Sequence, residues 1–510
     1  MSRRSIVILL GALMACGGSN VGSIGPLKAD IPVRDTTKVA KQVGKNGKQS
    51  PPTSSASKPS PFPAVAKKAL ANGLGVEVVE SHALPLVHVR VLVGAGMSYG
   101  GPGLATITAE MLKDGGTASL SAPQLAERVE SLGASLSVDT DFDRTVISLA
   151  VIKSHLADAL GLLAQVVGSP RFDDHELGNL KARMSDEAQE HARSSGQWAA
   201  TRLLFRELYP TTSPYATYDA TASEISKVNR SAITEFHRKF FVPKNMNVVL
   251  AGDVDSASAT AMVDKYFGKL AGGDVPKVEF PAPAPVAKRR VVLAARPGST
   301  QSDVFVASVA PERRSTDWPD LRVANQILGG GVASRLFMDV REQRSLAYST
   351  RSSILELGHG PQALMAYAGT ETKKTGLAVQ GILDNYDKIV SQPIDDAEVA
   401  SATRYLSDIF AVRMETIGAV ADLVVAQTAL GLPDGYWDAY RSEVRSVDNA
   451  RSVAAAKKLF RSDKVLVIVS GDAEVLAPKL AHFGEVVVVD PQQDFKTIKT
   501  LPADPAASLE

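Results

Sequence analysis

Two groups of side chains in this sequence have types and spacings that suit chemistry. The first lies in the segment GLATITAEMLKDGGT, residues 103–117, which has the character of a helix and carries one central carboxylate, Glu110. The second is Arg341 followed seven positions later by Tyr348. A fixed guanidinium and a phenol hydroxyl both donate hydrogen bonds to carbonyl oxygens, most strongly to an oxygen that is acquiring negative charge.

The helical segment lacks the side chains of a zinc site. In the inverted motif H-x-x-E-H, two histidines four residues apart bind the metal from one helix face, and the Glu between them activates the bound water. The corresponding positions here are Thr106, Ala109 and Glu110. Threonine is a poor zinc donor, alanine cannot act as a general base, and a single carboxylate falls short of three protein ligands. We therefore expect no zinc here and no other cofactor.

The histidines elsewhere in the chain do not form a helical metal-binding pair. No two of them are four residues apart: they are His82, His88, His155, His175, His191, His237, His359 and His482. Histidines scattered in this way are typical of surface and capping positions, which is the interpretation adopted here.

The 103–117 segment resembles the pitrilysin/insulinase family, which includes the mitochondrial processing peptidases. Active members of that family read approximately G-L-A-H-x-x-E-H-M-x-x-x-G-T. The positions that fit this frame, with one extra residue in the Gly115-Gly116 turn, are Gly103, Leu104, Ala105, Met111 and Thr117. In active relatives a Glu on a later helix completes the metal site. The resemblance implies Glu187 as its counterpart, with Glu176 and Glu190 as competitors.

A second segment resembles the glycine loop and Arg/Tyr signature of the same family. It comprises Leu328-Gly329-Gly330-Gly331, then Ser334 to Phe337, then Val340 to Tyr348. The resemblance implies that Arg341 and Tyr348 hold the substrate backbone and stabilise the reacting carbonyl, with Arg344 as a competitor for the arginine role. The alternative is a buried tyrosine at a helix-to-strand junction and a surface arginine. No Gly-Lys-Ser/Thr follows the glycines, so a phosphate loop is excluded; a flexible loop that allows closure or peptide approach is favoured.

The chain contains two related halves. Three landmarks recur about 220 residues apart: RFDDHELGNLKARM from Arg171 and PIDDAEVASATRYL from Pro393, VVLAGDVD from Val248 and VIVSGDAE from Val467, and VISLAV from Val146 and ALMAYA from Ala363. Repeats of this length are whole domains. The predicted boundaries are an N-terminal domain at 62–276, a proline-rich linker at 277–290, a C-terminal domain at 291–490 and a tail at 491–510.

Short apolar strands alternate with helices within each half, which predicts an α+β fold. The expected strands in the first half are Val87 to Val93, Ala134 to Asp139 and Thr145 to Val151. The expected helices are 103–114, Gln124 to Leu132, His155 to Val167 and a long amphipathic stretch from Asp173. The resemblance implies two homologous metallopeptidase-like domains, each an antiparallel-rich sheet packed with helices, that face one another as a clamshell.

The N-terminus has the order of a bacterial lipoprotein signal. A basic start precedes an apolar stretch too short to span a bilayer, and Leu13-Met14-Ala15-Cys16 closes it. We expect a signal peptide at 1–15, lipid on Cys16 and a solvated tether to residue 61, because 17–61 lacks aromatic residues and is rich in Ser, Pro, Gly and Lys. The expected location is the periplasm-facing cell envelope, with the outer membrane mildly preferred.

The sequence thus predicts a non-catalytic, lipid-anchored family member. By analogy with relatives that divide the chemistry between two chains, the expected partners are a zinc-bearing homologue, in a heterodimer, and a peptide substrate. A net charge of +1 gives no reason to expect nucleic acid. Two alternatives remain open: an active metallopeptidase with nonstandard ligands such as Glu110 and Glu187, and an envelope scaffold or peptide-binding protein without a role in proteolysis.

Overall fold

The computed structural model describes residues 60–509. The predicted signal peptide, Cys16 and nearly all of the predicted tether lie outside these residues. Within the described part of the chain, no helix combines the length and apolar character needed to cross a membrane.

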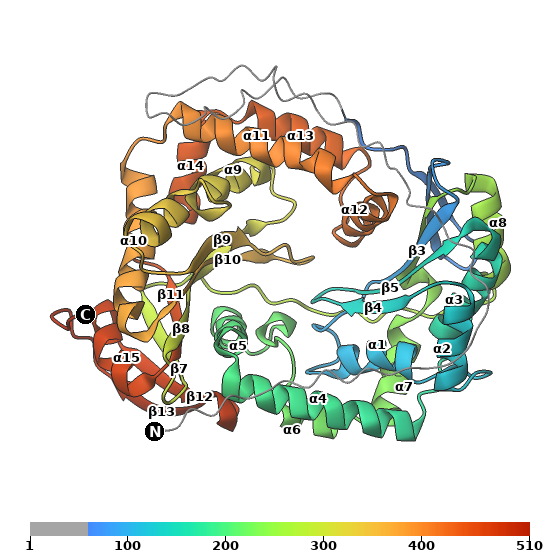
Figure 1. Cartoon of the computed structure of the whole chain (residues 1–510), viewed down its shortest axis with the longest axis horizontal. Coiled ribbons are helices and arrows are strands. Elements are labelled where there is room, and N and C mark those ends of the chain that lie inside the picture. The colour runs from blue at the N-terminus through green and yellow to red at the C-terminus, as the bar shows by residue number, and fades with distance from the viewer. Residues whose placement is uncertain (1–59, 510) are drawn as a thin grey trace, which may run out of the picture. The chain divides into compact units, whose positions relative to one another are not determined.

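The N-terminal half contains a six-stranded mixed sheet (Figure 1). Strands β2 and β6 pair in parallel, and the other neighbours are antiparallel. The spatial order is β1 (Ala66–Ala69), β2 (Gly75–Glu80), β6 (Met246–Gly252), β3 (Leu86–Val93), β5 (Thr145–Ile152) and β4 (Leu136–Thr140).

The C-terminal half contains a seven-stranded mixed sheet. Strand β7 pairs in parallel with β12 and β11, and the remaining neighbours are antiparallel. The spatial order is β13 (Lys496–Leu501), β12 (Val486–Asp490), β7 (Arg290–Ala295), β11 (Leu466–Gly471), β8 (Gln301–Glu312), β10 (Pro361–Glu371) and β9 (Ser349–Ile354).

Helices pack against both sheets. Those of the N-terminal half are α1 (Leu104–Asp114), α2 (Ala122–Ser131), α3 (Leu156–Gly168), α4 (Asp174–Ser194), α5 (Gly196–Leu208), α6 (Ala222–Lys227), α7 (Arg230–Phe240) and α8 (Ser256–Phe267). Those of the C-terminal half are α9 (Trp318–Gly329), a π-helix (Phe337–Gln343), α10 (Thr375–Ser391), α11 (Asp396–Arg413), α12 (Ile417–Ala429), α13 (Tyr436–Ser446), α14 (Asn449–Leu459) and α15 (Ala473–Leu480).

The expected strands and helices of the first half are confirmed to within a few residues, and local chemistry explains their ends. Helix α2 begins in a capping box in which Ser121 and Gln124 satisfy each other's backbone. Asp173 caps α4 by accepting from the N–H of His175 at 3.0 Å. Residues such as Leu160, spaced along one face of α3, are buried.

The three repeated sequence landmarks occupy corresponding elements of the two halves. The first pair forms α4 and α11, and the second forms β6 and β11, each of which has one parallel and one antiparallel neighbour. The third pair forms β5 and β10, each next to the strand at one edge of its sheet. The α+β class and the two helix-packed sheets are therefore as the sequence predicts.

Each half sends one helix onto the sheet of the other half, which the sequence analysis did not foresee. One face of the first sheet packs against its own helices, while the opposite face, which includes Val79, Leu92 and Val249, packs against α12. In the same way α5 covers the second sheet, where Leu203 and Phe205 meet Val292, Phe305 and Ile468 in a buried cluster. Figure 1 shows both helices against these sheets. Burying one such aliphatic side chain stabilises a fold by about 1.5–3 kcal/mol.

Polar contacts secure the exchanged helices. On α12, Asp422 accepts from Arg90 Nε at 2.8 Å, and the hydroxyl of Thr428 donates to the buried carboxylate of Glu77 at 2.9 Å. Beside α5, Arg296 Nη2 donates to the carbonyl of Ser194 at 2.6 Å. The two halves are therefore joined by packing and hydrogen bonds as well as by the connecting chain.

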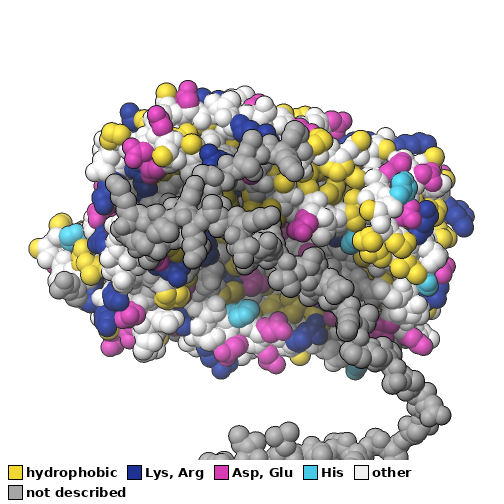
Figure 2. All heavy atoms as spheres, turned by 45° about the horizontal axis from the view of Figure 1, so that its top comes forward, with side chains coloured by type: hydrophobic (Ala, Val, Ile, Leu, Met, Phe, Trp, Pro, Cys, Tyr) yellow, Lys and Arg dark blue, Asp and Glu magenta, His cyan; other side chains and the backbone are white. Residues whose placement is uncertain are grey.

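Charged side chains of both signs are interspersed over the face shown in Figure 2. This distribution agrees with the formal net charge of +1. Where grey atoms do not cover this face, Figure 2 shows no broad basic field of the kind that binds nucleic acid.

Candidate functional site

Helix α1 has the frame of a zinc-binding helix but presents other side chains. It starts at Gly103, whose φ of 74° lies in the left-handed region that favours glycine. Ala109, at the position of the general base, is buried and has no polar atom beyond its backbone. Thr106, at the position of the first histidine, is half-buried.

The carboxylates that were expected at the metal site are Glu110, which forms an ion pair, and Glu187, which is exposed to solvent. Glu110 Oε2 forms an ion pair with Lys113 Nζ on the same helix at 2.8 Å. Glu187 is exposed on α4 and forms no hydrogen bond or ion pair with any described residue. One turn earlier, Arg183 reaches Asp114 of α1 at 3.1 Å. The donor set of Thr106, Glu110 and Glu187 does not fit the three-ligand requirement of zinc.

Histidines do not complete a metal site in this structure. His82 Nδ1 lies 2.7 Å from Asp253, His237 Nε2 lies 2.7 Å from the carbonyl of Val167, and His359 stacks on Phe280 with ring centroids 4.1 Å apart. Across residues 60–509, no three or more His, Cys, Asp or Glu side chains are grouped so that they could hold a metal ion.

The glycine run lies where α9 ends beside β9. Gly329 is buried, and a Cβ at this position would lie 2.5 Å from the backbone nitrogen of Ser352. A Cβ on Gly330 would lie 2.2 Å from the side chain of Gln326, whereas Gly331 has more room. None of the three has a positive φ. The close approach of α9 to β9 therefore accounts for Gly329 better than the loop flexibility that the sequence favours.

The predicted arginine lies on the π-helix and is accessible. The Arg341 guanidinium lies 4.6 Å from the ring centroid of Phe337 and 3.6 Å from Glu342, and its side chain is 44% exposed. The competitor Arg344 lies 3.6 Å from Asp384 of α10. Among the described residues, the ion pair and the ring contact of Arg341 are thus both with its own helix, whereas Arg344 forms an ion pair with α10.

The predicted tyrosine stands at the start of β9, with its ring over a glycine. The backbone N–H of Tyr348 donates to the carbonyl of Gly369 at 3.0 Å. A Cβ on Gly369 would lie 2.7 Å from Tyr348 Oη and 2.9 Å from Tyr367 Oη, so only glycine leaves room for both phenols. Tyr348 is 53% exposed and its hydroxyl has no partner among the described residues. It is thus a fixed and free hydrogen-bond donor.

The edge strand beside α1 has unpaired backbone groups. At the β4–β5 turn the N–H of Asp141 donates to Arg144 at 3.0 Å, and the register pairs Val138 with Ile147. Because bonded and non-bonded pairs alternate in an antiparallel ladder, the N–H and C=O of Val138 point away from β5. They meet no other backbone group in the described part of the chain. Such an edge can accept an extended peptide as an added strand.

The corresponding edge of the second sheet is closed. The backbone N–H and C=O of the buried residue Ser352 on β9 point away from β10, and Asn325 Nδ2 of α9 donates to that carbonyl at 3.1 Å. The hydroxyl of Ser352 in turn donates to Asn325 Oδ1 at 2.6 Å. An added strand would have to displace these bonds, so strand addition is favoured at β4 over β9.

A polar hollow of about 360 Å³ lies between the β4–β5 face and α12. Asp139 is exposed there, while Arg144 pairs with Asp141 at 2.8 Å. Asp422 and Val425 of α12 form the opposite wall. This hollow adjoins the free edge of β4 and offers charged groups to a peptide lying there.

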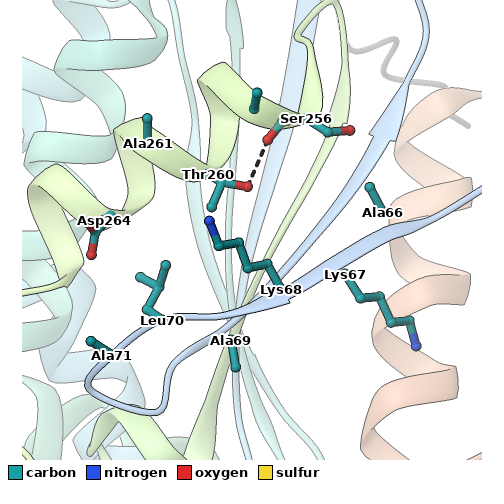
Figure 3. Close-up of a pocket in the computed structure, with 11 residues that line it drawn as sticks. Ala66, Lys67, Lys68, Ala69, Leu70, Ala71, Ser256, Thr260, Ala261 and Asp264 are labelled. Carbon is teal, nitrogen blue, oxygen red and sulfur yellow. Dashed lines mark hydrogen bonds between the residues drawn. The ribbon is translucent and has the colours of Figure 1, made fainter.

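A second hollow of about 580 Å³ lies between β1 and the start of α8, and small side chains line most of it. Figure 3 shows Lys68 extending toward Thr260, whose hydroxyl donates to the carbonyl of Ser256 at 2.7 Å. None of the predicted site residues lies in this hollow.

A polar junction around the buried phenols of Tyr99 and Tyr215 links the two halves, and no sequence pattern predicts it. Asp143, in the β4–β5 turn, accepts from Tyr215 Oη at 2.5 Å and from the N–H of Gly358 at 2.7 Å. His359 donates its N–H to Tyr215 Oη at 3.1 Å, and its ring lies 3.3 Å from Tyr99 Oη, in the loop before α1. Burial raises the pKa of Asp143, and the hydrogen bonds that it accepts from Tyr215 and Gly358 oppose that rise. No local pattern marks these residues, because the contacts join segments far apart in the chain.

Comparison with known proteins places these features in a family context. Residues 76–215 match the family described as Insulinase (Peptidase family M16), and residues 227–406 match Peptidase M16 inactive domain. An uncharacterized zinc protease of Mycobacterium tuberculosis is 30% identical over 341 residues, which span 64% of this chain and 76% of that protein. A non-peptidase homolog of Helicobacter pylori is 26% identical over 364 residues, which span 69% of this chain and 82% of that protein.

Solved structures show the same fold. A peptidase M16 inactive domain from Pseudomonas fluorescens superposes with a TM-score of 0.74 at 26% identity, covering 80% of this chain and 98% of that one. A protease from Helicobacter pylori has a TM-score of 0.73 at 21% identity, covering 80% of this chain and all of the other. The relatives thus carry names of both peptidases and non-peptidases, and their names alone do not assign an activity to this chain.

Proposed function

The chain belongs to peptidase family M16, the insulinase and pitrilysin family, and from that premise we propose that it is a non-catalytic member that works with a zinc-bearing homologue. This proposal rests on the side chains that α1 presents at the three positions of the zinc motif. Ala109 replaces the general base, and Glu110, which replaces the second histidine, is paired with Lys113. The partner chain would supply the metal, which polarises a peptide carbonyl and activates water.

In this proposal the chain contributes the substrate-holding side of a peptide-processing chamber. Arg341 and Tyr348 are exposed donors on rigid elements, one on the π-helix and one at the start of β9. Both would donate to carbonyl oxygens of a peptide held at the partner's metal, and a donor already in place favours the oxygen that gains charge. We also propose that the two halves face one another as a clamshell.

We further propose that lipid on Cys16 anchors the chain in the cell envelope, facing the periplasm. The order of basic start, short apolar stretch and cysteine supports this proposal. Several acyl chains on one residue would give stable attachment, because each buried CH₂ contributes roughly 0.8 kcal/mol.

Co-purification from native membranes tests the pairing and the anchor together. The tagged chain is expected to elute with a homologue that carries the zinc motif, and the eluate is expected to cleave peptides in a chelator-sensitive manner. A Cys16→Ser variant is expected to leave the membrane fraction and serves as the control for localisation. Elution of the chain alone, or cleavage by the chain alone, would contradict the pairing.

A second candidate function is peptide binding without proteolysis. The free edge of β4 beside the polar hollow favours it, because both lie within this chain and need no partner. If that is the function, the purified chain binds extended peptides with no homologue present, and substitutions of Arg341 or Tyr348 leave any proteolysis by a reconstituted pair unchanged.

A further inference from the structure

A cation outside the predicted Arg/Tyr signature lies beside Tyr348. Arg351 is on β9, opposite Tyr367 of β10 in the antiparallel register. Its guanidinium carbon lies 4.3 Å from the ring centroid of Tyr367. Paired residues in a ladder present their side chains on the same face. Tyr367 belongs to the cluster that packs against α5, so Arg351 lies on the same face of the sheet as that helix.

A hydrogen bond to Asp303 fixes the position of Tyr367. Its hydroxyl donates to Asp303 Oδ1 at 2.7 Å, and a Cβ on Gly369 would lie within 3 Å of both this hydroxyl and that of Tyr348, at 2.9 and 2.7 Å. Asp303 lies beside the start of α5, where a Cβ on Gly196 would come within 2.2 Å of its carboxylate. The ring of Tyr367 is therefore a fixed platform with Tyr348 at one end and Arg351 over its face.

Both outer groups of this platform are free to bind. Arg351 is exposed and forms no ion pair with any described residue, although its charge acts on the nearby carboxylate of Asp303 and opposes the rise that burial causes in the pKa of that group. The hydroxyl of Tyr348 likewise has no hydrogen-bond partner in the described part of the chain. Stacking on a ring leaves the edge of a guanidinium, with its N–H groups, pointing outward. A planar set of charged donors suits a carboxylate, which can accept two parallel hydrogen bonds from arginine.

We propose that Arg351, which lies over the ring of Tyr367 beside Tyr348, is a carboxylate-binding site for the peptide. The carboxylate is that of the peptide C-terminus or of an acidic side chain. This inference rests on the proposed function, since it assumes that peptides reach this face. It adds Arg351 to the residues that hold the substrate and adds a charge preference to that function.

Peptide binding by the purified full-length chain tests the proposal, measured by fluorescence anisotropy with pools of decapeptides that are labelled at the N-terminus and randomised without Asp or Glu. Four pools separate the two sources: a free C-terminal acid, a C-terminal amide, an amide with a fixed central Glu, and an amide with a fixed central Gln. A carboxylate-bearing pool is expected to bind about tenfold more tightly than its neutral counterpart. Preference for the acid over the amide indicates the C-terminus, and preference for Glu over Gln indicates a side chain.

Variants assign the preference to Arg351. Arg351→Gln is expected to abolish the tenfold difference, and Arg351→Lys to retain part of it. Arg404→Gln removes an exposed arginine on α11 and is expected to keep the whole difference. Matching circular dichroism spectra show that the variants are folded. Equal binding of all four pools, or a preference that survives Arg351→Gln, overturns this inference alone. If the wild-type chain binds none of the four pools, two proposals are overturned. One is the carboxylate site at Arg351, and the other is peptide binding by the isolated chain.

Discussion

Replacing Tyr348 with Phe is expected to slow peptide cleavage by the reconstituted pair about 100-fold, the size measured when one donor to a developing oxyanion is removed. The substitution deletes a single hydroxyl. The ring keeps its place over Gly369, where the backbone N–H of Tyr348 remains bonded to the Gly369 carbonyl. The loss should therefore fall on the chemical step more than on folding.

Steady-state cleavage of a fluorogenic peptide checks this expectation, with kcat and KM determined separately. A donor that acts mainly in the transition state lowers kcat and kcat/KM together. Tyr405→Phe is the matched control, because Tyr405 is an exposed tyrosine on α11 that lies 49% open to solvent. If Tyr348→Phe cleaves as fast as the Tyr405 variant, Tyr348 has no role in catalysis and the scaffold alternative is favoured.

Replacing Asp143 with Ala is expected to lower the free energy of unfolding by about 2–6 kcal/mol. The change leaves two donors, Tyr215 Oη and the Gly358 N–H, without an acceptor, and each buried unsatisfied group costs about 1–3 kcal/mol. Because Gly358 belongs to the other half, the β9–β10 turn should also exchange its amide hydrogens faster. Urea unfolding and hydrogen exchange measure the two effects. A change in the free energy of unfolding below about 0.5 kcal/mol, the range of ordinary surface substitutions, would show that this junction does not join the halves.

The same carboxyl should make stability depend on pH. Burial raises the folded-state pKa of Asp143 above the ordinary value of 3.8, so the folded chain binds this proton more tightly than the unfolded chain. The stabilisation that this proton gives the folded state is complete at a pH below the unfolded-state pKa of Asp143. It is lost as the pH rises through the folded-state pKa. Relative to Asp143→Asn, the wild type should therefore become less stable across that window. A wild type that gains stability over the variant with rising pH would show that the hydrogen bonds outweigh burial.

The sequence predicts the elements of this fold well because their signals are local. The apolar periodicity of α3 and the caps at Ser121 and Asp173 each act within a few residues. The repeated landmarks also predict equivalent elements in the two halves. In contrast, the exchange of α5 and α12 depends on which sheet face each apolar helix covers, and that choice is settled only by tertiary packing.

The candidate site is predictable only where the chemistry lies within one segment. The positions of Thr106, Ala109 and Glu110 on one helix follow from their spacing. The pairing of Glu110 with Lys113 also involves neighbours on that helix. The cap of Asn325 on β9 and the platform of Tyr367 bring together residues from different elements. Contacts between distant elements leave no local pattern in a single sequence, so the sequence does not indicate a role for Arg351.

The most direct test of the central claim is the zinc content of the purified chain after incubation with excess zinc and removal of unbound metal, measured by mass spectrometry. The face of α1 lacks the required donors, so the predicted content is far below one zinc per chain. Glu110→Gln, which removes the one carboxylate among the three motif positions Thr106, Ala109 and Glu110, is predicted to leave that content unchanged. One tightly held zinc per chain, lost on Glu110→Gln, would contradict the account and favour an active metallopeptidase with nonstandard ligands.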